Sequence, residues 1–237
     1  MEPTIVLVHG AFAESASWDG VIDALLEDGY PVIAAANPLR GLASDAAAIS
    51  DLVGTIEGPV VLAAHSYGGA VITNVDPDAG DIAGLVYVAG FAPAAGESAF
   101  TLAGEFPGST LGEALVPTKR ADGTTDLTIA RDRFHSQFCA DVPAAQAARM
   151  AATQRPATQE ALVEPSGDRP LWKAVPSWFV FGEEDRNLPA ALEYHMAERA
   201  QARRKVEVPG ASHALTVAHP RATAHMIREA AALRLVA

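Results

Sequence analysis

The chain of 237 residues has very little cysteine and few basic residues. Its single cysteine, Cys139, excludes a disulfide within the chain and gives no sign of an oxidising compartment. The 17 lysines and arginines are outnumbered by 29 aspartates and glutamates, which leaves a formal net charge of -12. Since the longest basic run covers only residues 203–205, nucleic acid and anionic membranes are poor candidate partners.

Long apolar runs are also missing. No stretch approaches the roughly 20 residues that a membrane-spanning helix requires. A strand-like run begins at residue 4, which leaves no room for a signal peptide before it. We therefore expect a cytoplasmic protein, either a monomer or a homodimer. Hydrophobic residues make up 49% of the chain, which is enough to fill the core of one domain.

Short apolar segments alternate with amphipathic segments along most of the chain. Six short segments are predicted strands, and most of them are apolar on both faces, which is typical of buried parallel strands. They cover residues 4–9, 32–36, 60–64, 84–90, 178–181 and 205–208. Because the connections between them are long enough for crossovers, we predict an α/β fold with a six-stranded parallel sheet flanked by helices.

This alternation breaks down between residues 92 and 172. The stretch is rich in proline, glycine and threonine, and it contains a predicted hairpin with its turn at Asp122-Gly123, followed by short alanine-rich helices. We predict that residues 1–91 and 173–237 form the core, and that residues 92–172 form a cap inserted over the sheet.

Ser66 stands at the junction between the third predicted strand and an apolar helical pattern. The residues two positions away, Ala64 and Gly68, are small. This spacing is that of a nucleophile elbow, in which a strained turn holds a side chain out for chemistry. A second interpretation stays open, because serine is also a common helix N-cap and glycine is common in turns.

Three groups with complementary chemistry follow three predicted strands: Ser66 the third, Asp185 the fifth and His213 the sixth. Parallel strands end at a shared edge, where ligands bind, so we expect these groups to meet. A serine hydroxyl needs an imidazole to take its proton, and the imidazole needs a carboxylate to fix its tautomer. After the first strand, the backbone N–H of Ala11 can join that of Tyr67 in binding an oxyanion.

These motifs and the order Ser, Asp, His resemble the α/β-hydrolase superfamily over nearly the whole chain. The likeness is to the compact six-strand branch that includes plant methylesterases, hydroxynitrile lyases and bacterial esterase-like hydrolases. His-Gly-Ala-Phe looks like its oxyanion loop, Ala-His-Ser-Tyr-Gly-Gly like its elbow, Gly-Glu-Glu-Asp-Arg-Asn-Leu-Pro like its acid loop and Gly-Ala-Ser-His like its histidine loop. The resemblance implies a sheet order of 2-1-3-4-5-6 and hydrolysis of a small, mostly apolar ester through an acyl-enzyme, with no cofactor.

At three positions the chain differs from particular members of this superfamily, which argues against the reactions that those members catalyse. The lyases carry a lysine directly after the catalytic histidine and a threonine in the oxyanion loop, where this chain has Ala214 and Gly10. Haloalkane dehalogenases have an aspartate at the position of Ser66. Two alternatives to an esterase remain: a non-catalytic ligand-binding or signalling protein on the same fold, and a cofactor-free, non-hydrolytic relative of the perhydrolase type.

Other residues compete for roles in the site. Glu183 and Glu184 precede Asp185 and are expected to be exposed, and Glu97 is the one candidate acid after the fourth strand. Aromatic candidates for the wall of an apolar substrate pocket are Phe12, Phe134, Phe138 and Trp172.

The remaining histidines are interpreted as structural or solvated. His9 and His65 flank backbone turns, His135 lies between two phenylalanines of the cap, and three others fall on predicted surface helices, namely His195, His219 and His225. No histidine spacing matches a metal-binding motif, so we expect no metal.

Overall fold

The computed structural model describes residues 2–232 of the chain. Its main sheet is parallel, with six strands in the order β2-β1-β3-β4-β8-β9. Counted along the core, this is the order 2-1-3-4-5-6, so the predicted fold is confirmed. The strands are β1 (Thr4–Val8), β2 (Val32–Ala35), β3 (Pro59–Ser66), β4 (Asp81–Gly90), β8 (Ser177–Gly182) and β9 (Arg204–Val208).

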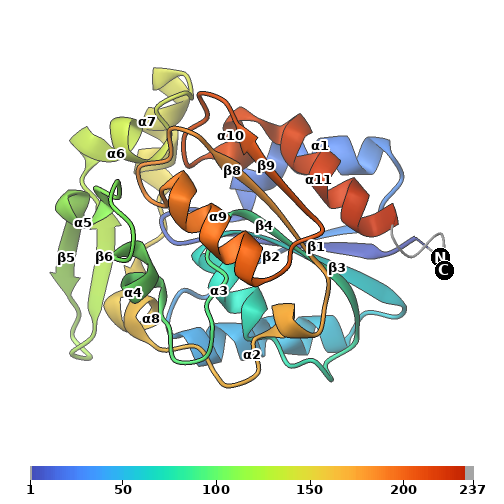
Figure 1. Ribbon diagram of the computed structural model, residues 1–237. Coiled ribbons are helices and arrows are strands. Elements are labelled where there is room, and N and C mark those ends of the chain that lie inside the picture. The colour runs from blue at the N-terminus through green and yellow to red at the C-terminus, as the bar shows by residue number, and fades with distance from the viewer. Residues whose placement is uncertain (1, 233–237) are drawn as a thin grey trace.

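Helices cover both faces of this sheet (Figure 1). On one face, α1 (Asp19–Glu27) and α11 (Pro220–Ala232) pack against Ile5 and Leu7 of the first strand. The other face, which includes Val6, carries α2 (Leu42–Gly54), α3 (Tyr67–Thr73) and α9 (Ala190–Arg199). Burial on both faces explains why the central strands β1 and β3 are nearly continuously apolar in the sequence, whereas the edge strand β9 is partly exposed and contains charged residues. The predicted last helix extends to Leu233, which lies outside the described residues.

Most of the short elements of the predicted cap lie at one end of the sheet, whereas η2 lies beside α3 (Figure 1). The hairpin of the cap, β5 and β6, is antiparallel as predicted, and a third strand, β7, pairs with β6. The cap elements are α4 (Ala99–Ala103), α5 (Leu111–Ala114), β5 (Leu115–Lys119), β6 (Thr125–Ile129), α6 (Arg131–Phe138), α7 (Ala144–Thr153), β7 (Ala157–Thr158), α8 (Gln159–Val163) and η2 (Leu171–Lys173).

Hydrogen bonds join the cap to loops that follow core strands. After β1, the backbone N–H of Phe12 donates to the carbonyl of Arg155 at 3.1 Å. After β8, the side chain of Asn187 accepts from the amide of Gln137 at 2.8 Å. Since these loops leave the carboxyl ends of parallel strands, the cap lies over the edge of the sheet where ligands bind in this class of fold.

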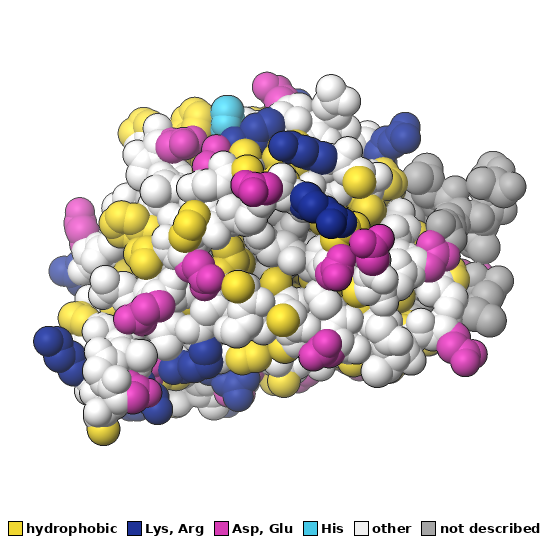
Figure 2. Space-filling view, turned by 90° about the horizontal axis from the view of Figure 1, so that it is seen from below, with side chains coloured by type: hydrophobic (Ala, Val, Ile, Leu, Met, Phe, Trp, Pro, Cys, Tyr) yellow, Lys and Arg dark blue, Asp and Glu magenta, His cyan; other side chains and the backbone are white. Residues whose placement is uncertain are grey.

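The surface of the described part carries mixed charges. On the face shown in Figure 2, acidic and basic side chains are interspersed with apolar ones. Between residues 2 and 232, no helix combines the length and the apolar character needed to span a membrane. Cys139 is buried within the cap, and burial raises the pKa of its thiol to about 12.

Candidate active site

Ser66 occupies a strained turn between β3 and α3. Its φ of 55° and ψ of -126° are unusual for a residue with a Cβ, and such strain persists mainly where it serves a function. The hydroxyl does not cap the helix that follows, which decides against the ordinary helix start. Gly68 permits the close approach of α3 to β1, because a Cβ there would lie 2.6 Å from the carbonyl oxygen of Val8.

The first residue of α3 is anchored through its side chain. The hydroxyl of Tyr67 donates to Oδ2 of Asp45 on α2 at 2.9 Å, and Asp45 also accepts from the backbone N–H of Arg40. Burial raises the pKa of both Asp45 and Tyr67. The phenol thus fixes the elbow to α2, and the group that Tyr67 can offer to a substrate is its backbone N–H. No spacing or periodicity in the sequence predicts this long-range contact.

Asp185 and His213 form a fully buried pair. Nδ1 of His213 lies 2.7 Å from Oδ2 of Asp185, and neither side chain is exposed to solvent. Oδ1 of Asp185 accepts from the backbone N–H groups of Asn187 at 2.7 Å and Leu188 at 2.9 Å. Because the carboxylate can only accept, the imidazole carries its proton on Nδ1. Nε2 is left without a hydrogen-bond partner among residues 2–232, and in the neutral ring it is the basic nitrogen.

The competing acids lie elsewhere. Glu183 accepts from the backbone N–H of Gly210, and Glu97 forms an ion pair with Arg199 at 2.7 Å. Although burial raises the pKa of Glu97, the bonds from Arg199 outweigh it and hold the pKa below its ordinary range. Within the described residues, Asp185 is the carboxylate that hydrogen-bonds to His213.

His65 joins the elbow strand to the histidine loop. Its Nε2 donates to the carbonyl oxygen of His213 at 2.9 Å, and the two imidazole rings lie 4.6 Å apart. Complete burial, together with the nearby His213, lowers the pKa of His65 well below its ordinary value, so it stays neutral. Since Ser66 is the next residue, this contact brings the loop of His213 beside the nucleophile candidate.

The Ser66 hydroxyl and Nε2 of His213 do not hydrogen-bond to each other, and neither has another partner in the described chain. Such bonds often form or tighten only when a substrate is bound. Both groups are therefore uncommitted: a hydroxyl at a strained turn and a basic nitrogen carried by the adjoining loop.

The loop after β1 lies directly against the nucleophile candidate. A Cβ on Gly10 would sit 2.6 Å from the Cβ of Ser66 and 3.3 Å from its Oγ, so only glycine fits without a shift. His9 holds this loop, because its Nδ1 bonds the carbonyl of Gly10 at 3.0 Å while its Nε2 accepts from the backbone of Asn37 at 3.1 Å. Burial lowers the pKa of His9, in keeping with the predicted structural role.

Two backbone donors in this region are uncommitted. The N–H of Ala11 has no acceptor among residues 2–232, whereas that of Phe12 is used by the carbonyl of Arg155. The N–H of Tyr67 belongs to the first turn of α3, where no acceptor exists within the helix. The loop and the helix start thus offer the two predicted donors.

The predicted aromatic residues separate into two groups. Phe138 packs edge-on against the ring of His213 at 5.0 Å, and Phe134 stacks on Phe138 at 5.1 Å. Trp172 instead donates its indole N–H to Pro93 at 2.9 Å and lies below the guanidinium of Arg199. The contacts of Trp172 in the described chain do not connect it with the pair of His213.

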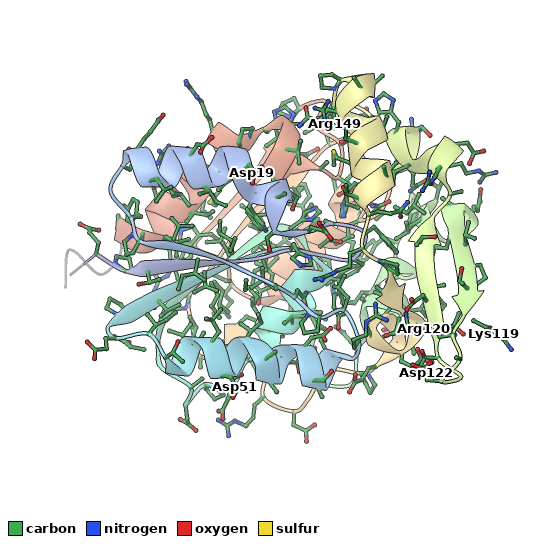
Figure 3. The ribbon with its side chains drawn as sticks, turned by 180° about the vertical axis from the view of Figure 1, so that it is seen from behind. Asp19, Asp51, Lys119, Arg120, Asp122 and Arg149 are labelled. Carbon is green, nitrogen blue, oxygen red and sulfur yellow. The ribbon has the colours of Figure 1, made fainter. Side chains whose placement is uncertain are left out.

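The site is covered. Ser66 is 7% exposed and His213 is 0% exposed. A cavity of about 420 Å³ lies between the segment after β1 and helix α7, and Phe12 forms part of its wall. Asp19 and Arg149, labelled in Figure 3, line this cavity from the core and from the cap. Neither Ser66 nor His213 lines this cavity.

No three His, Cys, Asp or Glu side chains within residues 2–232 gather into a group suited to a metal ion. The features that carry chemistry are the strained serine, the histidine–carboxylate pair and the two free N–H groups. On a parallel sheet of this order, they are typical of an α/β hydrolase.

The comparisons with known proteins agree with this class. A model described as the alpha/beta hydrolase family matches residues 5–226, and the chain belongs to that family. A search among curated proteins finds no match.

Similar solved structures cover nearly the whole chain. Polyneuridine aldehyde esterase has a TM-score of 0.80 at 16% identity, covering 97% of this chain and 99% of that one. A pyrethroid hydrolase from Sphingobium faniae JZ-2 has a TM-score of 0.74 at 22% identity, covering 99% of both chains. A methylesterase from Arabidopsis has a TM-score of 0.79 at 15% identity, covering 98% and 100%. At these identities the likeness is one of fold.

Proposed function

We propose that the protein is a serine hydrolase that cleaves a small, mostly apolar carboxylic ester through an acyl-enzyme. The observation that carries the proposal is the 2.7 Å bond between Nδ1 of His213 and Asp185. It leaves Nε2 unprotonated on a loop tied to the strand of Ser66. A nucleophile, a base and a group that orients the base are the three parts that nucleophilic catalysis requires.

In the first half of the reaction, Oγ of Ser66 attacks the ester carbonyl carbon while its proton passes to Nε2 of His213. The carbonyl electrons move onto oxygen, and the oxyanion accepts from the N–H groups of Ala11 and Tyr67. When the intermediate collapses, the bond to the alcohol oxygen breaks, and His213 returns the proton to the leaving alcohol. Ser66 is then acylated.

In the second half, water replaces the alcohol. His213 takes a proton from the water as it attacks the acyl carbon, and then returns that proton to Oγ of Ser66 as the acid leaves. Asp185 keeps its hydrogen bond to Nδ1 and stabilises the imidazolium that forms in each half. The residues of the chain supply every group that these reaction steps require, so the mechanism uses no cofactor.

The apolar nature of the substrate is supported by the surroundings of His213. Phe138 and Phe134 lie on one side of its ring, and Phe12 lies beside the oxyanion loop. The names of the similar structures, an aldehyde esterase, a pyrethroid hydrolase and a methylesterase, also support ester substrates.

The test is turnover of p-nitrophenyl esters of graded acyl length by the parent and by Ser66→Ala. We expect kcat to fall by at least about 10⁴-fold in the variant, because removing a nucleophile abolishes the covalent path. The series of acyl lengths shows which acyl group the site accepts. A variant that retains the parent rate would eliminate this mechanism.

A ligand-binding protein on the same fold is the second candidate. It is favoured by one observation, the complete burial of His213. The two functions differ in turnover. Rapid modification of Ser66 by a fluorophosphonate, combined with no more than one cleaved ester per chain, would support binding without catalysis.

A cytoplasmic location is part of the same proposal and rests on the single cysteine, which is buried. Cell fractionation tests it. Size-exclusion chromatography with light scattering distinguishes a monomer from a homodimer.

A further inference from the structure

Asp141 lies in the cap, in the turn between α6 and α7, and its carboxylate bonds three groups of the core. Oδ1 accepts from the hydroxyl of Ser212. Oδ2 accepts from the backbone N–H of Ser212 at 3.1 Å and from Nε2 of His219 at 2.9 Å. Burial raises the pKa of Asp141, but the bonds from Ser212 and His219 outweigh it and hold the pKa below its ordinary range. The carboxylate is therefore ionised at neutral pH.

Both donors of Ser212 belong to the residue directly before His213. The carbonyl of His213 is held separately by Nε2 of His65 at 2.9 Å. The backbone that carries the imidazole is thus fixed on one side by the elbow strand and on the other by the cap. The same cap segment touches the ring itself, since Phe138 packs edge-on against it at 5.0 Å.

The ring is held by the bond from Nδ1 to Asp185 and by its packing against the rings of His65 and Phe138, whereas Nε2 has no partner among residues 2–232. The direction in which Nε2 points depends on these contacts and on the position of the loop backbone that carries the ring. A shift of about 1 Å in a catalytic group is enough to lower a rate about 100-fold.

We propose that Asp141 is a positioning residue for His213, which acts by holding Ser212 when the cap is docked. The inference rests on the proposed serine hydrolase function and deepens it. Docking of the cap then does two things at once: it covers the site and it fixes the base that activates Ser66. Opening the cap to admit a substrate releases the histidine loop, and closure restores it.

A simpler explanation is that Asp141 only helps to attach the cap. The chain contains a matched residue that separates the two explanations. Asp126 on β6 is also a cap carboxylate, and it pairs with Arg40 of the core at 2.7 Å and with Arg120 at 2.8 Å. Its side chain is 10% exposed, against 20% for Asp141. Asp126→Ala removes a link between cap and core without touching Ser212.

The experiment compares Asp141→Ala, Asp141→Asn and Asp126→Ala in the full-length protein. We expect Asp141→Ala to lower kcat for p-nitrophenyl acetate by about 10- to 100-fold with little change in KM. Asp141→Asn keeps an acceptor and a donor for Ser212, so its kcat should stay within about 3-fold of the parent. Asp126→Ala should leave kcat unchanged while it lowers the melting temperature.

A second readout does not depend on turnover. In the resting protein, ¹⁵N–¹H NMR of the imidazoles reports the His213 ring, assigned by its loss in His213→Ala. The proposal expects Asp141→Ala to shift or broaden this signal and Asp126→Ala to leave it in place. If the parent cleaves no ester at all, the proposed function fails, while the NMR comparison still tests the positioning role.

Equal losses of kcat in the two alanine variants, or an unmoved His213 signal in Asp141→Ala, would overturn the inference. Should Asp141→Ala fail to fold, Ser212→Ala takes its place. It removes the hydroxyl bond and leaves the backbone bond, and we expect a smaller fall in kcat with the same shift of the His213 signal. An unchanged kcat and an unchanged His213 signal in Ser212→Ala would also overturn the inference.

Discussion

Replacing Asp185 by asparagine should prevent His213 from acting as a base, although the His213 side chain is still present. Oδ1 of Asp185 accepts from two backbone N–H groups, those of Asn187 and Leu188. In Asp185→Asn, the amide oxygen must keep this position, because the opposite orientation would point an NH₂ group at both donors. Each unsatisfied N–H would cost about 1–3 kcal/mol. The NH₂ group therefore faces Nδ1 of His213.

This orientation forces His213 into the wrong tautomer. With a donor opposite it, Nδ1 must accept, so the proton moves to Nε2, which can no longer take the proton of Ser66. In a serine protease, the equivalent change lowers kcat by about 10⁴-fold. The same factor corresponds to about 5.5 kcal/mol of transition-state stabilisation, and we expect a similar loss for this protein.

The assay is kcat for p-nitrophenyl acetate, with circular dichroism to confirm folding. Glu183→Gln is the matched control, because Glu183 lies in the same loop, is exposed and accepts from the backbone N–H of Gly210. Its kcat should stay within about 2-fold of the parent, since surface changes away from a site have small effects. The reasoning would be refuted by a folded Asp185→Asn variant with near-parental kcat, or by an equal loss in Glu183→Gln.

Three further substitutions test the supports of the site. Gly10→Ala places a Cβ 2.6 Å from the Cβ of Ser66. We expect a fall of about 1–3 kcal/mol in the free energy of unfolding and a lower kcat/KM. A variant with the stability and activity of the parent would contradict this expectation. Tyr67→Phe removes the hydrogen bond to Asp45 and should lower the free energy of unfolding in urea by about 1–3 kcal/mol, with little change in kcat. A large loss of kcat would mean that the phenol acts in catalysis. Glu193 on α9 is fully buried, and burial, then the nearby Asp185, raises its pKa well above 4.5. Ionisation of Glu193 is disfavoured in the fold. The stability of the parent relative to Glu193→Gln should therefore fall as pH rises above about 4.5, by up to about 1.4 kcal/mol per pH unit. In urea titrations, a stability difference that is constant from pH 4 to 8 would count against this expectation.

The sheet could be predicted because its signal is local. The central strands β1 and β3 are nearly continuous apolar runs, since both of their faces are covered, and the residues after a strand end must lie at the ligand edge. That rule, together with the elbow spacing at Ser66 and the resemblance of the acid and histidine loops to the hydrolase family, led us to expect Ser66, Asp185 and His213 to be neighbours. Their contacts in the structure, through Asp185 and His65, are consistent with the selection.

The polar supports of the site could not be predicted. Asp45 precedes an apolar pattern and looks like a helix start, yet it bonds Tyr67, 22 residues away. His219 was expected to be solvated, but it bonds Asp141, 78 residues away. A hydrogen bond between distant residues has no periodicity and no fixed spacing, so a single sequence does not reveal it.

The cap was predicted as an insertion, but most of its elements were not. Helices α4 (Ala99–Ala103) and α5 (Leu111–Ala114) have 5 and 4 residues, too few to show a helical repeat. Strand β7 has 2 residues and depends on its pairing with β6. Short elements of this kind are stabilised by tertiary packing rather than by local preference.

The most direct test of the central claim is to follow covalent modification of Ser66 by a fluorophosphonate, using intact-protein mass spectrometry and peptide mapping. We expect one adduct per chain, located on Ser66, and a much slower reaction in both His213→Ala and Asp185→Asn. An adduct on another residue, or labelling of Ser66 at an undiminished rate in His213→Ala, would contradict it.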